Sequence, residues 1–413
     1  MIKVCVCTSN EGAAEPRAPR HAAAIAELGS DFQVMFIDSA PIGHEPAPVK
    51  MFCHLSNVRR LTHRFSSRAK SILRLAVDRG CQQLGRIYFK VTGLPTAGAL
   101  STKAFGLERD LLATNADFFI AHNVETLLPA VRAAARRGSV LIFDSMEFHS
   151  DMGDGQSSIE QRIIRAVERH CLPKCALVLA SSDQIADALV NEYRITRPLP
   201  LFNVPPKQNE ISAKPDHGLA LYWRNAVVGL GQRGLDEALV ALTKLPEDVS
   251  LNLQGRMPRD GGDALKMRIA ELGLQQRVIF HRPYSPDDAV KEASQYHIGL
   301  CLERPGIRNH ELTVSNKIFD YHMAGLAIVA SDLPALRSVL ERSGGGLLFE
   351  PGSATDLAKK ILTFYNDRES LNRFATSARQ FAMREGNREV EMKKFIARFR
   401  ELCSLRTTAK IER

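Results

Sequence analysis

The sequence predicts an α/β protein with two Rossmann-like domains that face each other across a cleft. Short apolar segments alternate with helical patterns along the whole chain, which is typical of parallel sheets covered by helices. These segments form two sets of six, and a polar stretch with three prolines separates the sets. A length of 413 residues also exceeds what one hydrophobic core accommodates, so two domains are expected.

Each apolar segment is short and bounded by turn-forming residues, so it is predicted to be a strand. The strands expected in the first set are 3–8, 33–37, 117–122, 140–144, 177–181 and 199–202. Those expected in the second set are 219–223, 250–254, 278–281, 298–302, 327–331 and 347–350.

The segment 203–218 between the two sets has the composition of an interdomain linker. It predicts a first domain over 1–205 and a second over 206–385, followed by a C-terminal segment over 386–413. A last helix is expected over about 387–403, and we expect it to pack back on the first domain because its apolar residues recur at helical spacing. These residues are Met392, Phe395, Ile396, Phe399, Leu402 and Cys403.

An apolar content of 45% and a charged content of 24% describe a soluble globular protein. The N-terminus alternates like a strand and lacks the pattern of a signal peptide, so a cytoplasmic location is expected. The cysteines at 5, 7, 171, 175 and 301 lie in or beside apolar segments at spacings unlike zinc sites, and we expect reduced thiols. The sequence lacks phosphate-loop, zinc-hydrolase and serine-hydrolase motifs, and neither a metal nor a cofactor is predicted.

A basic segment carries most of the net charge of +9. Residues 58–90 hold nine basic residues and one acidic residue, a surplus of 9 − 1 = +8, so nucleic acid is not predicted as a partner. Apolar residues 61, 65, 69, 72 and 76 follow helical spacing beside Arg60, Arg64 and Arg68, which predicts a basic amphipathic helix. Such a helix either lies on an anionic membrane surface at the inner face of the membrane or simply exposes its charged side to water.

A short capped helix is predicted in the second domain, directly before the strand 327–331. Ser315 suits the N-cap position and Gly325 suits the position after the C-cap, so the helix is expected over 316–324.

Three polar side chains gather near the start of this helix. Asn316 and Asp320 share one face, and Lys317 lies beside them, on an element whose N-terminus favours bound anions. An exposed Lys317–Asp320 ion pair on an ordinary surface helix is the alternative interpretation.

Residues 229–234 match the Gly-x-Gly-x-x-Gly dinucleotide fingerprint and precede a helix expected over 235–242. The context disfavours a NAD-dependent oxidoreductase, because the preceding strand is expected to end several residues earlier and the next one ends at Gln254 instead of an acid. We interpret the glycines as a loop that approaches a ligand diphosphate, with Arg224 and Arg233 as counter-charges. A solvated turn with two exposed arginines is an equally good interpretation.

In the first domain, polar residues follow strands that are expected to end at one edge of the sheet, where α/β proteins bind ligands. Gly12 follows the first strand and permits close approach of a ligand. His122, Asp144, Glu147 and His149 come at or after the ends of two later strands, although a single histidine there is more often structural.

The sequence resembles GT-B glycosyltransferases, specifically the retaining family 4 type, over nearly its whole length. The strongest likeness lies in residues 316–334 and 344–352, and segments 121–123, 143–148, 180–186 and 203–205 resemble the family in order and spacing. The resemblance implies a nucleoside diphosphate sugar as donor substrate and a saccharide or lipid-linked acceptor.

The resemblance also implies roles for residues in the second domain. Asp320 stands where the family has the second acid of a Glu, seven residues, Glu motif that holds the donor ribose, and Glu311 lies one position from the first. Arg224 and Arg233 resemble the residues that contact the diphosphate. The donor-binding residues expected are Arg224, Arg233, Glu311, Ser315, Asn316, Lys317 and Asp320.

Two positions depart from the family pattern in the first domain. Met146 replaces a histidine expected near the reacting sugar, and Asn123 stands where aspartate is common. Catalysis is therefore expected to depend on His122 or Glu147, or to be lost.

The function expected is sugar transfer without a metal, with retention, in the synthesis of cell-surface polysaccharide or glycoconjugate. Two alternatives stay open. A sugar-nucleotide epimerase would use the same scaffold, and a catalytically silent nucleotide-sugar-binding protein would explain Met146.

Overall fold

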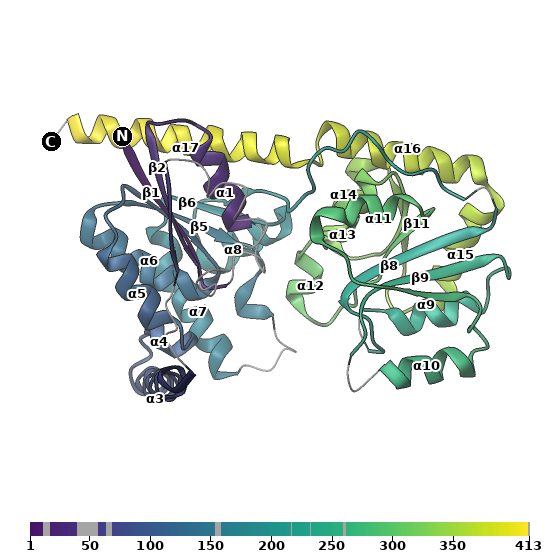
Figure 1. Ribbon diagram of the computed structural model, residues 1–413, viewed down its shortest axis with the longest axis horizontal. Coiled ribbons are helices and arrows are strands. Elements are labelled where there is room, and N and C mark those ends of the chain that lie inside the picture. Colours follow the sequence, from purple (N-terminus) through teal and green to yellow (C-terminus); the bar gives the residue numbers. More distant parts are fainter. Residues whose placement is uncertain are drawn as a thin grey trace. The chain divides into compact units, whose positions relative to one another are not determined.

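The computed structural model describes residues 1–10, 17–38, 57–62, 68–152, 158–215, 217–231, 233–258 and 262–411. Contacts divide the chain into two compact units. Unit 1 comprises Met1–Leu201 with Met392–Arg413, and unit 2 comprises Phe202–Glu391. Each unit is an open parallel sheet with helices packed on both faces (Figure 1), which is a Rossmann-like arrangement.

Unit 1 is built on a seven-stranded parallel sheet in the order β3-β2-β1-β4-β5-β6-β7. Its strands are β1 (Ile2–Thr8), β2 (Phe32–Asp38), β3 (Val58–Thr62), β4 (Phe118–His122), β5 (Val140–Ser145), β6 (Leu177–Ala180) and β7 (Leu199–Pro200). Its helices are α1 (Arg17–Ala26), α3 (Arg68–Thr92), α4 (Ala97–Leu100), α5 (Ala104–Ala113), α6 (Val124–Arg137), α7 (Ile159–Cys171) and α8 (Asp183–Tyr193), with 3-10 turns at His149–Asp151 and Leu172–Lys174.

Unit 2 is built on a six-stranded parallel sheet in the order β10-β9-β8-β11-β12-β13. Its strands are β8 (Leu219–Val227), β9 (Val249–Arg256), β10 (Val278–His281), β11 (Ile298–Cys301), β12 (Ala327–Ser331) and β13 (Gly346–Phe349). Its helices are α9 (Leu235–Leu242), α10 (Gly262–Glu271), α11 (Ala289–Ser294), α12 (Arg308–Leu312), α13 (Lys317–Met323), α14 (Pro334–Ser343), α15 (Ala354–Asn366) and α16 (Arg368–Arg384), with a 3-10 turn at Pro286–Asp288.

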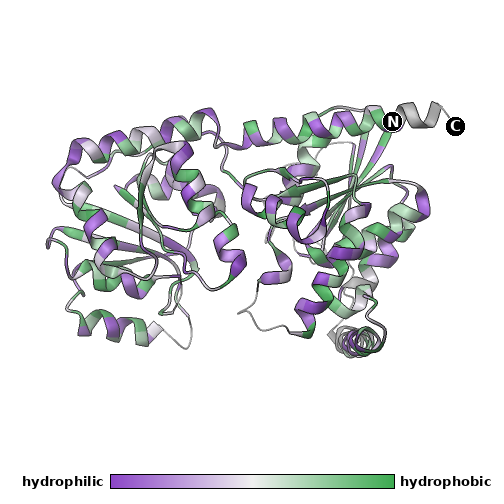
Figure 2. Cartoon of the chain, turned by 180° about the vertical axis from the view of Figure 1, so that it is seen from behind, coloured by the Kyte–Doolittle hydropathy of each residue, from purple (hydrophilic) through white to green (hydrophobic). Residues whose placement is uncertain are grey.

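The last helix, α17 (Arg388–Ile411), contributes to the core of unit 1. Phe395, Phe399 and Leu402 are buried there among residues of β1, β2 and β4. Hydrophobic residues follow the strands and one side of most helices, with hydrophilic residues on the other side (Figure 2). Burial of these apolar faces is what holds each sheet and its helices together.

The predicted α/β class and all twelve predicted strands are confirmed, with ends shifted by a few residues. One strand was missed: Val58–Thr62 was assigned to a basic helix, but it pairs in parallel with β2 from Val34–Val58 to Asp38–Thr62. Sheet hydrogen bonding at this edge outweighs the apolar spacing that indicated a helix. The helix begins only at Arg68, and Arg64 and Gly12 lie outside the described residues.

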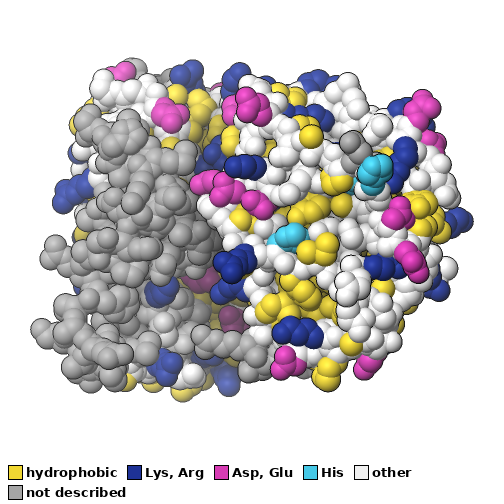
Figure 3. Space-filling model, turned by 45° about the vertical axis from the view of Figure 1, so that its right-hand side comes forward, with side chains coloured by type: hydrophobic (Ala, Val, Ile, Leu, Met, Phe, Trp, Pro, Cys, Tyr) yellow, Lys and Arg dark blue, Asp and Glu magenta, His cyan; other side chains and the backbone are white. Residues whose placement is uncertain are grey.

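The cysteines Cys5, Cys7, Cys171 and Cys301 are buried free thiols, as expected. None of the helices among the described residues combines the length and the apolar character needed to cross a bilayer. On the face of the molecule shown in Figure 3, basic and acidic side chains are interspersed among small apolar patches.

Candidate active site

Both sheets place polar residues at their topological switch points, where strand order reverses and α/β proteins bind ligands. In unit 2 the switch lies between β8 and β11, which are adjacent strands. Arg224 belongs to the carboxyl half of β8, and Glu303 follows β11 by two residues. In unit 1 the switch lies between β1 and β4, where Thr8 pairs with His122.

In unit 2, Arg224 is held by residues from two other segments, the loop after β10 and helix α13. Its guanidinium donates to the Tyr284 hydroxyl at 2.8 Å and forms an ion pair with Asp320. Its backbone N–H donates to the Tyr321 hydroxyl at 3.2 Å. The structure therefore brings together Arg224 and Asp320, two of the expected donor-binding residues, which are 96 residues apart in sequence.

A second charged group lies beside the first. The Glu303 carboxylate is only 4% exposed and lies 3.2 Å from Lys317 Nζ and 3.2 Å from Arg233 Nη1. Burial alone would raise the pKa of Glu303, but the attraction of Lys317 and Arg233 outweighs it and lowers the pKa to about 2. The carboxylate is thus charged at neutral pH and holds two cations at the switch point.

The position of α13 follows from close packing against β11. A Cβ atom at Gly299 would lie 2.3 Å from the Tyr321 ring, so glycine is needed for the helix to approach the strand. The helix runs over Lys317–Met323, and Gly325 after it has φ of 69°, as its predicted role requires.

Two expectations for α13 are wrong. Ser315 is not the N-cap; Asn316 occupies that position and makes no capping hydrogen bond with its side chain, while the Ser315 hydroxyl bonds to Glu303. The alternative of an exposed Lys317–Asp320 pair is also wrong, because Lys317 is 6% exposed and pairs with Glu303. Its ammonium also lies 5.6 Å from the centre of the Trp223 ring.

The glycine-rich loop follows β8 more closely than expected. The strand continues to Val227 with an irregularity after Arg224, so it ends just before Gly229. The strand context therefore does not argue against the dinucleotide fingerprint, but β9 ends in Gln254, Gly255 and Arg256 without the acid that would bind a ribose.

Elsewhere in unit 2, the expected residue Glu311 lies on α12 and accepts a hydrogen bond from the Gly306 N–H at 3.2 Å.

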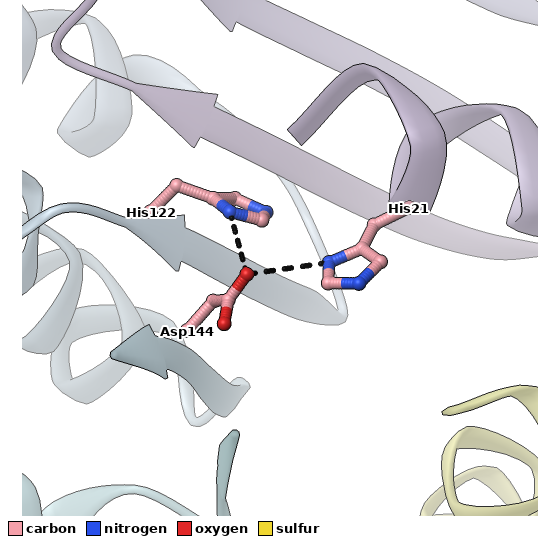
Figure 4. A group of neighbouring side chains, drawn as sticks. All are labelled: His21, His122 and Asp144. Atoms are coloured by element: carbon pink, nitrogen blue, oxygen red, sulfur yellow. Dashed lines mark ion pairs between the residues drawn. The ribbon is translucent and has the colours of Figure 1, made fainter. Parts of the chain in front are cut away.

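In unit 1, a buried network centres on Asp144 at the end of β5 (Figure 4). Arg17, at the start of α1, donates to both carboxylate oxygens at 2.8 and 2.7 Å. Nδ1 of His122 lies 3.1 Å and Nδ1 of His21 lies 3.9 Å from Asp144 Oδ2. The His21 ring also stacks on Phe395 of α17, with ring centres 4.3 Å apart.

The charges of this network are set by burial and by Arg17. Burial alone would raise the pKa of Asp144, but the adjacent guanidinium outweighs it, and the pKa is held well below its usual range. Burial lowers the pKa of His21 well below its ordinary value, so this ring is neutral at pH 7. Asp144 is therefore a permanent carboxylate whose counter-charge is Arg17.

His21, His122 and Asp144 have the residue types and spacing of a metal site, since their ligand atoms lie within 4.8 Å of one another. Arg17 argues against that assignment. Its guanidinium already occupies both oxygens of Asp144, and a cation bound there would be repelled by it. The group is better explained as a buried Arg–Asp–His network.

The expected catalytic residues differ in accessibility. His122 has no exposed surface, whereas Glu147, which follows β5, is half-buried. His149 is buried, and burial lowers its pKa to about 4.

Sequence reasoning missed three residues that organise these groups: Arg17, Glu303 and Tyr284. Glu303 follows a predicted strand end, and that signal could have identified it. Arg17 belongs to no motif, and its partner Asp144 is 127 residues away, so only the fold reveals the pair.

His322 on α13 gives unit 2 a specific pH dependence. Its ring is fully buried, and burial lowers its pKa to about 3, against about 6.5 in an unfolded chain. The resulting contribution to stability is complete above about pH 6.5 and falls by up to ~1.4 kcal/mol per unit as pH decreases toward 3. We expect urea unfolding, followed by Trp223 fluorescence, to show less stability loss from pH 7 to 5 in His322→Leu than in the wild type. An unchanged slope in His322→Leu would contradict the assignment.

Two Rossmann-like parallel sheets in one chain, each with polar residues at its switch point, define the GT-B class of fold. Residues 227–367, all within unit 2, match the family described as Glycosyl transferases group 1. No curated protein matches the chain significantly.

Solved structures of the same class cover nearly the whole chain. Anabaena HepE in complex with UDP-glucose has a TM-score of 0.69 and 14% identity over 97% of this chain and 100% of its own. Sucrose-phosphate synthase from Thermosynechococcus elongatus has a TM-score of 0.67 and 14% identity over 98% and 100%. The lipopolysaccharide outer core galactosyltransferase WaaB has a TM-score of 0.62 and 15% identity over 96% and 98%. The chain therefore shares the GT-B fold of these structures, with two Rossmann-like domains.

Proposed function

We propose that the protein transfers a sugar from a nucleoside diphosphate sugar to a saccharide or lipid-linked acceptor, with retention of configuration, in the synthesis of a cell-surface polysaccharide or glycoconjugate. The observation that carries the proposal is the gathering of Arg224, Asp320, Lys317 and Arg233 around the switch point of unit 2, within the segment that matches the family. The solved structure of HepE with UDP-glucose supports a donor of this kind.

In the proposed donor site, the carboxylate binds the ribose and the three basic side chains bind or stabilise the diphosphate. Asp320 would accept hydrogen bonds from the ribose hydroxyls, because a carboxylate accepts several at once. Arg224 and Arg233 would bind the diphosphate, and Arg233 is the more accessible of the two, with 39% of its side chain exposed. Lys317 would add charge near the leaving group, so that the protein itself stabilises the departing diphosphate without a metal.

We assign the acceptor to the predicted first domain, residues 1–205, and the donor to the predicted second domain, residues 206–385. In a retaining transfer of this type the leaving diphosphate takes the acceptor proton, so position and charge matter more than a protein nucleophile. We assign Glu147 as the group that contacts the sugars. His122, which is buried against Asp144, is assigned a positioning role.

The first test is calorimetric titration with UDP-, GDP-, ADP- and TDP-sugars without added metal. One donor is expected to bind with a dissociation constant on the order of micromolar, and Asp320→Asn to weaken it at least about tenfold. Asp236→Asn is the matched control, because Asp236 pairs with Arg268 on the surface of the same unit. Absence of binding by every donor, or equal binding by Asp320→Asn, would contradict the donor site.

Reaction assays then separate the alternatives. Consumption of the bound donor only when an acceptor saccharide is present would support transfer. Conversion of the donor sugar to its epimer without an acceptor would indicate an epimerase. Binding with neither transfer nor slow hydrolysis would indicate a silent binding protein, and Met146→His would then test whether the missing histidine is the cause.

A further inference from the structure

Helix α3 of unit 1 carries an apolar face that points away from its own domain. The helix packs on α4 through Gln82, Gly85 and Arg86, and Phe89 on the same side of α3 is buried. A Cβ atom at Gly85 would lie 2.8 Å from the Thr96 hydroxyl oxygen, so the helix approaches its neighbour closely and its orientation is fixed. In Figure 1, α3 is seen end-on at the margin of unit 1 beside α4.

The outer face of α3 consists of large apolar side chains at helical spacing. Val77, Leu84, Tyr88 and Val91 are separated by seven, four and three residues, and Ile87 lies next to them, so they share one side of the helix. Leu84 is 67% and Val91 is 81% exposed. We name these five residues, with the exposed Leu94 after the helix, the α3 ridge. A contiguous exposed set of this kind marks an interaction surface.

The charge of the helix selects the kind of surface that the ridge fits. The helix has one acidic residue, Asp78, and its basic residues are Arg68, Lys70, Arg74, Arg79, Arg86 and Lys90. Arg79 and Lys90 are exposed on one flank of the ridge. A second copy of this helix would bring like charges together, whereas an anionic lipid surface offers phosphates to the basic residues and hydrocarbon to the ridge.

We infer that the α3 ridge docks unit 1 on an anionic bilayer, with the helix lying in the plane of the interface. The ridge begins where the apolar stripe expected from sequence ends, so the membrane surface is assigned to Val77–Leu94 instead of to the segment with Arg60, Arg64 and Arg68. Of these three, Arg60 lies in β3, Arg64 is outside the described residues, and Arg68 begins α3. The inference goes beyond the proposed transfer reaction and does not depend on the identity of the donor.

Flotation with lipid vesicles tests the inference on the full chain. The protein is expected to bind vesicles of phosphatidylcholine with phosphatidylglycerol, and to bind pure phosphatidylcholine at least about tenfold more weakly. Leu84→Ser/Val91→Ser should reduce binding to the anionic vesicles at least about tenfold. Met267→Ser, which replaces a similarly exposed residue on α10, should bind like the wild type.

A second variant and a second measurement complete the design. Arg79→Gln/Lys90→Gln should weaken binding to anionic vesicles. It should also make binding less sensitive to salt, because fewer contacts between basic side chains and lipid phosphates remain for salt to screen. Donor titrations of all variants should match the wild type, so a failed donor site and a failed membrane site give different results.

Two outcomes would overturn the inference. The first is absence of vesicle binding by the wild type, or binding that the ridge variant retains in full. The second is a dimer in light scattering that Leu84→Ser/Val91→Ser dissociates, because the ridge would then be an interface between two copies of the chain.

Discussion

Asp144→Ala is expected to destabilise unit 1 by about 3–5 kcal/mol, because removing one partner of a buried ion pair leaves the other charge without compensation. Arg17 is buried, and both of its bonds to Asp144 would be lost. Its remaining hydrogen bond, to the Leu201 carbonyl at 2.6 Å, does not neutralise its charge. For a unit of about 200 residues, this loss corresponds to a decrease of ~6–20 °C in melting temperature.

The single tryptophan of the chain makes this prediction specific to one unit. Trp223 lies in β8, so its fluorescence reports unit 2, whereas circular dichroism reports both units. Asp144→Ala should shift part of the dichroism transition to lower temperature and leave the fluorescence transition in place. Equal shifts of both signals, or no shift of either, would contradict the prediction.

Two further variants separate charge from packing. Asp187→Ala, which breaks a surface pair with Arg197 in the same unit, should cost at most ~1 kcal/mol. Arg17→Met/Asp144→Leu removes both charges together and should recover most of the stability lost in Asp144→Ala, because apolar residues of similar size replace a buried pair at little cost. Failure of the double variant to recover would show that His21 and His122 also depend on the carboxylate.

The sequence predicts the sheets well because their signal is local. A run such as 327–331 is apolar, short and bounded by turn residues, and these properties do not depend on the rest of the chain. Strand β3 lacks this signal, since Arg59 and Arg60 interrupt it and its pairing with β2 is a tertiary interaction. The basic helix was expected to include residues 60 and 61 but begins only at Arg68, and that expectation was wrong for the same reason.

The candidate site is predicted less completely because its contacts join distant segments. Resemblance to a family identifies Arg224 and Asp320 one by one, but their ion pair spans 96 residues and depends on the order of β8 and β11. Glu303 is absent from any motif, although it holds Lys317 and Arg233. Buried ion pairs of this kind become visible only when the strand order is known.

Glu303→Gln is expected to destabilise unit 2 by about 3 kcal/mol in the absence of ligand. The substitution keeps the size of the side chain and removes the charge that compensates Lys317, which is nearly buried, and Arg233, which is partly exposed. Trp223 fluorescence should report the loss directly, because this ring lies against the Lys317 ammonium. Glu237→Gln is the matched control: its partner Arg304 is 43% exposed, and the cost should be at most ~1 kcal/mol.

A nucleoside diphosphate should reverse much of this loss if Lys317 and Arg233 bind the donor. The diphosphate would supply the negative charge that the glutamine lacks, so the variant should bind it more tightly than the wild type does. Ligand at about 100 times the wild-type dissociation constant stabilises the wild type by ~2.7 kcal/mol, and the same concentration should stabilise Glu303→Gln by more. The comparison requires thermal unfolding of both proteins with UDP, GDP, ADP and TDP at equal concentrations. Equal ligand-induced shifts would show that the two cations do not contact the diphosphate. A smaller shift in Glu303→Gln would show instead that Glu303 holds the cations in the position that binding requires.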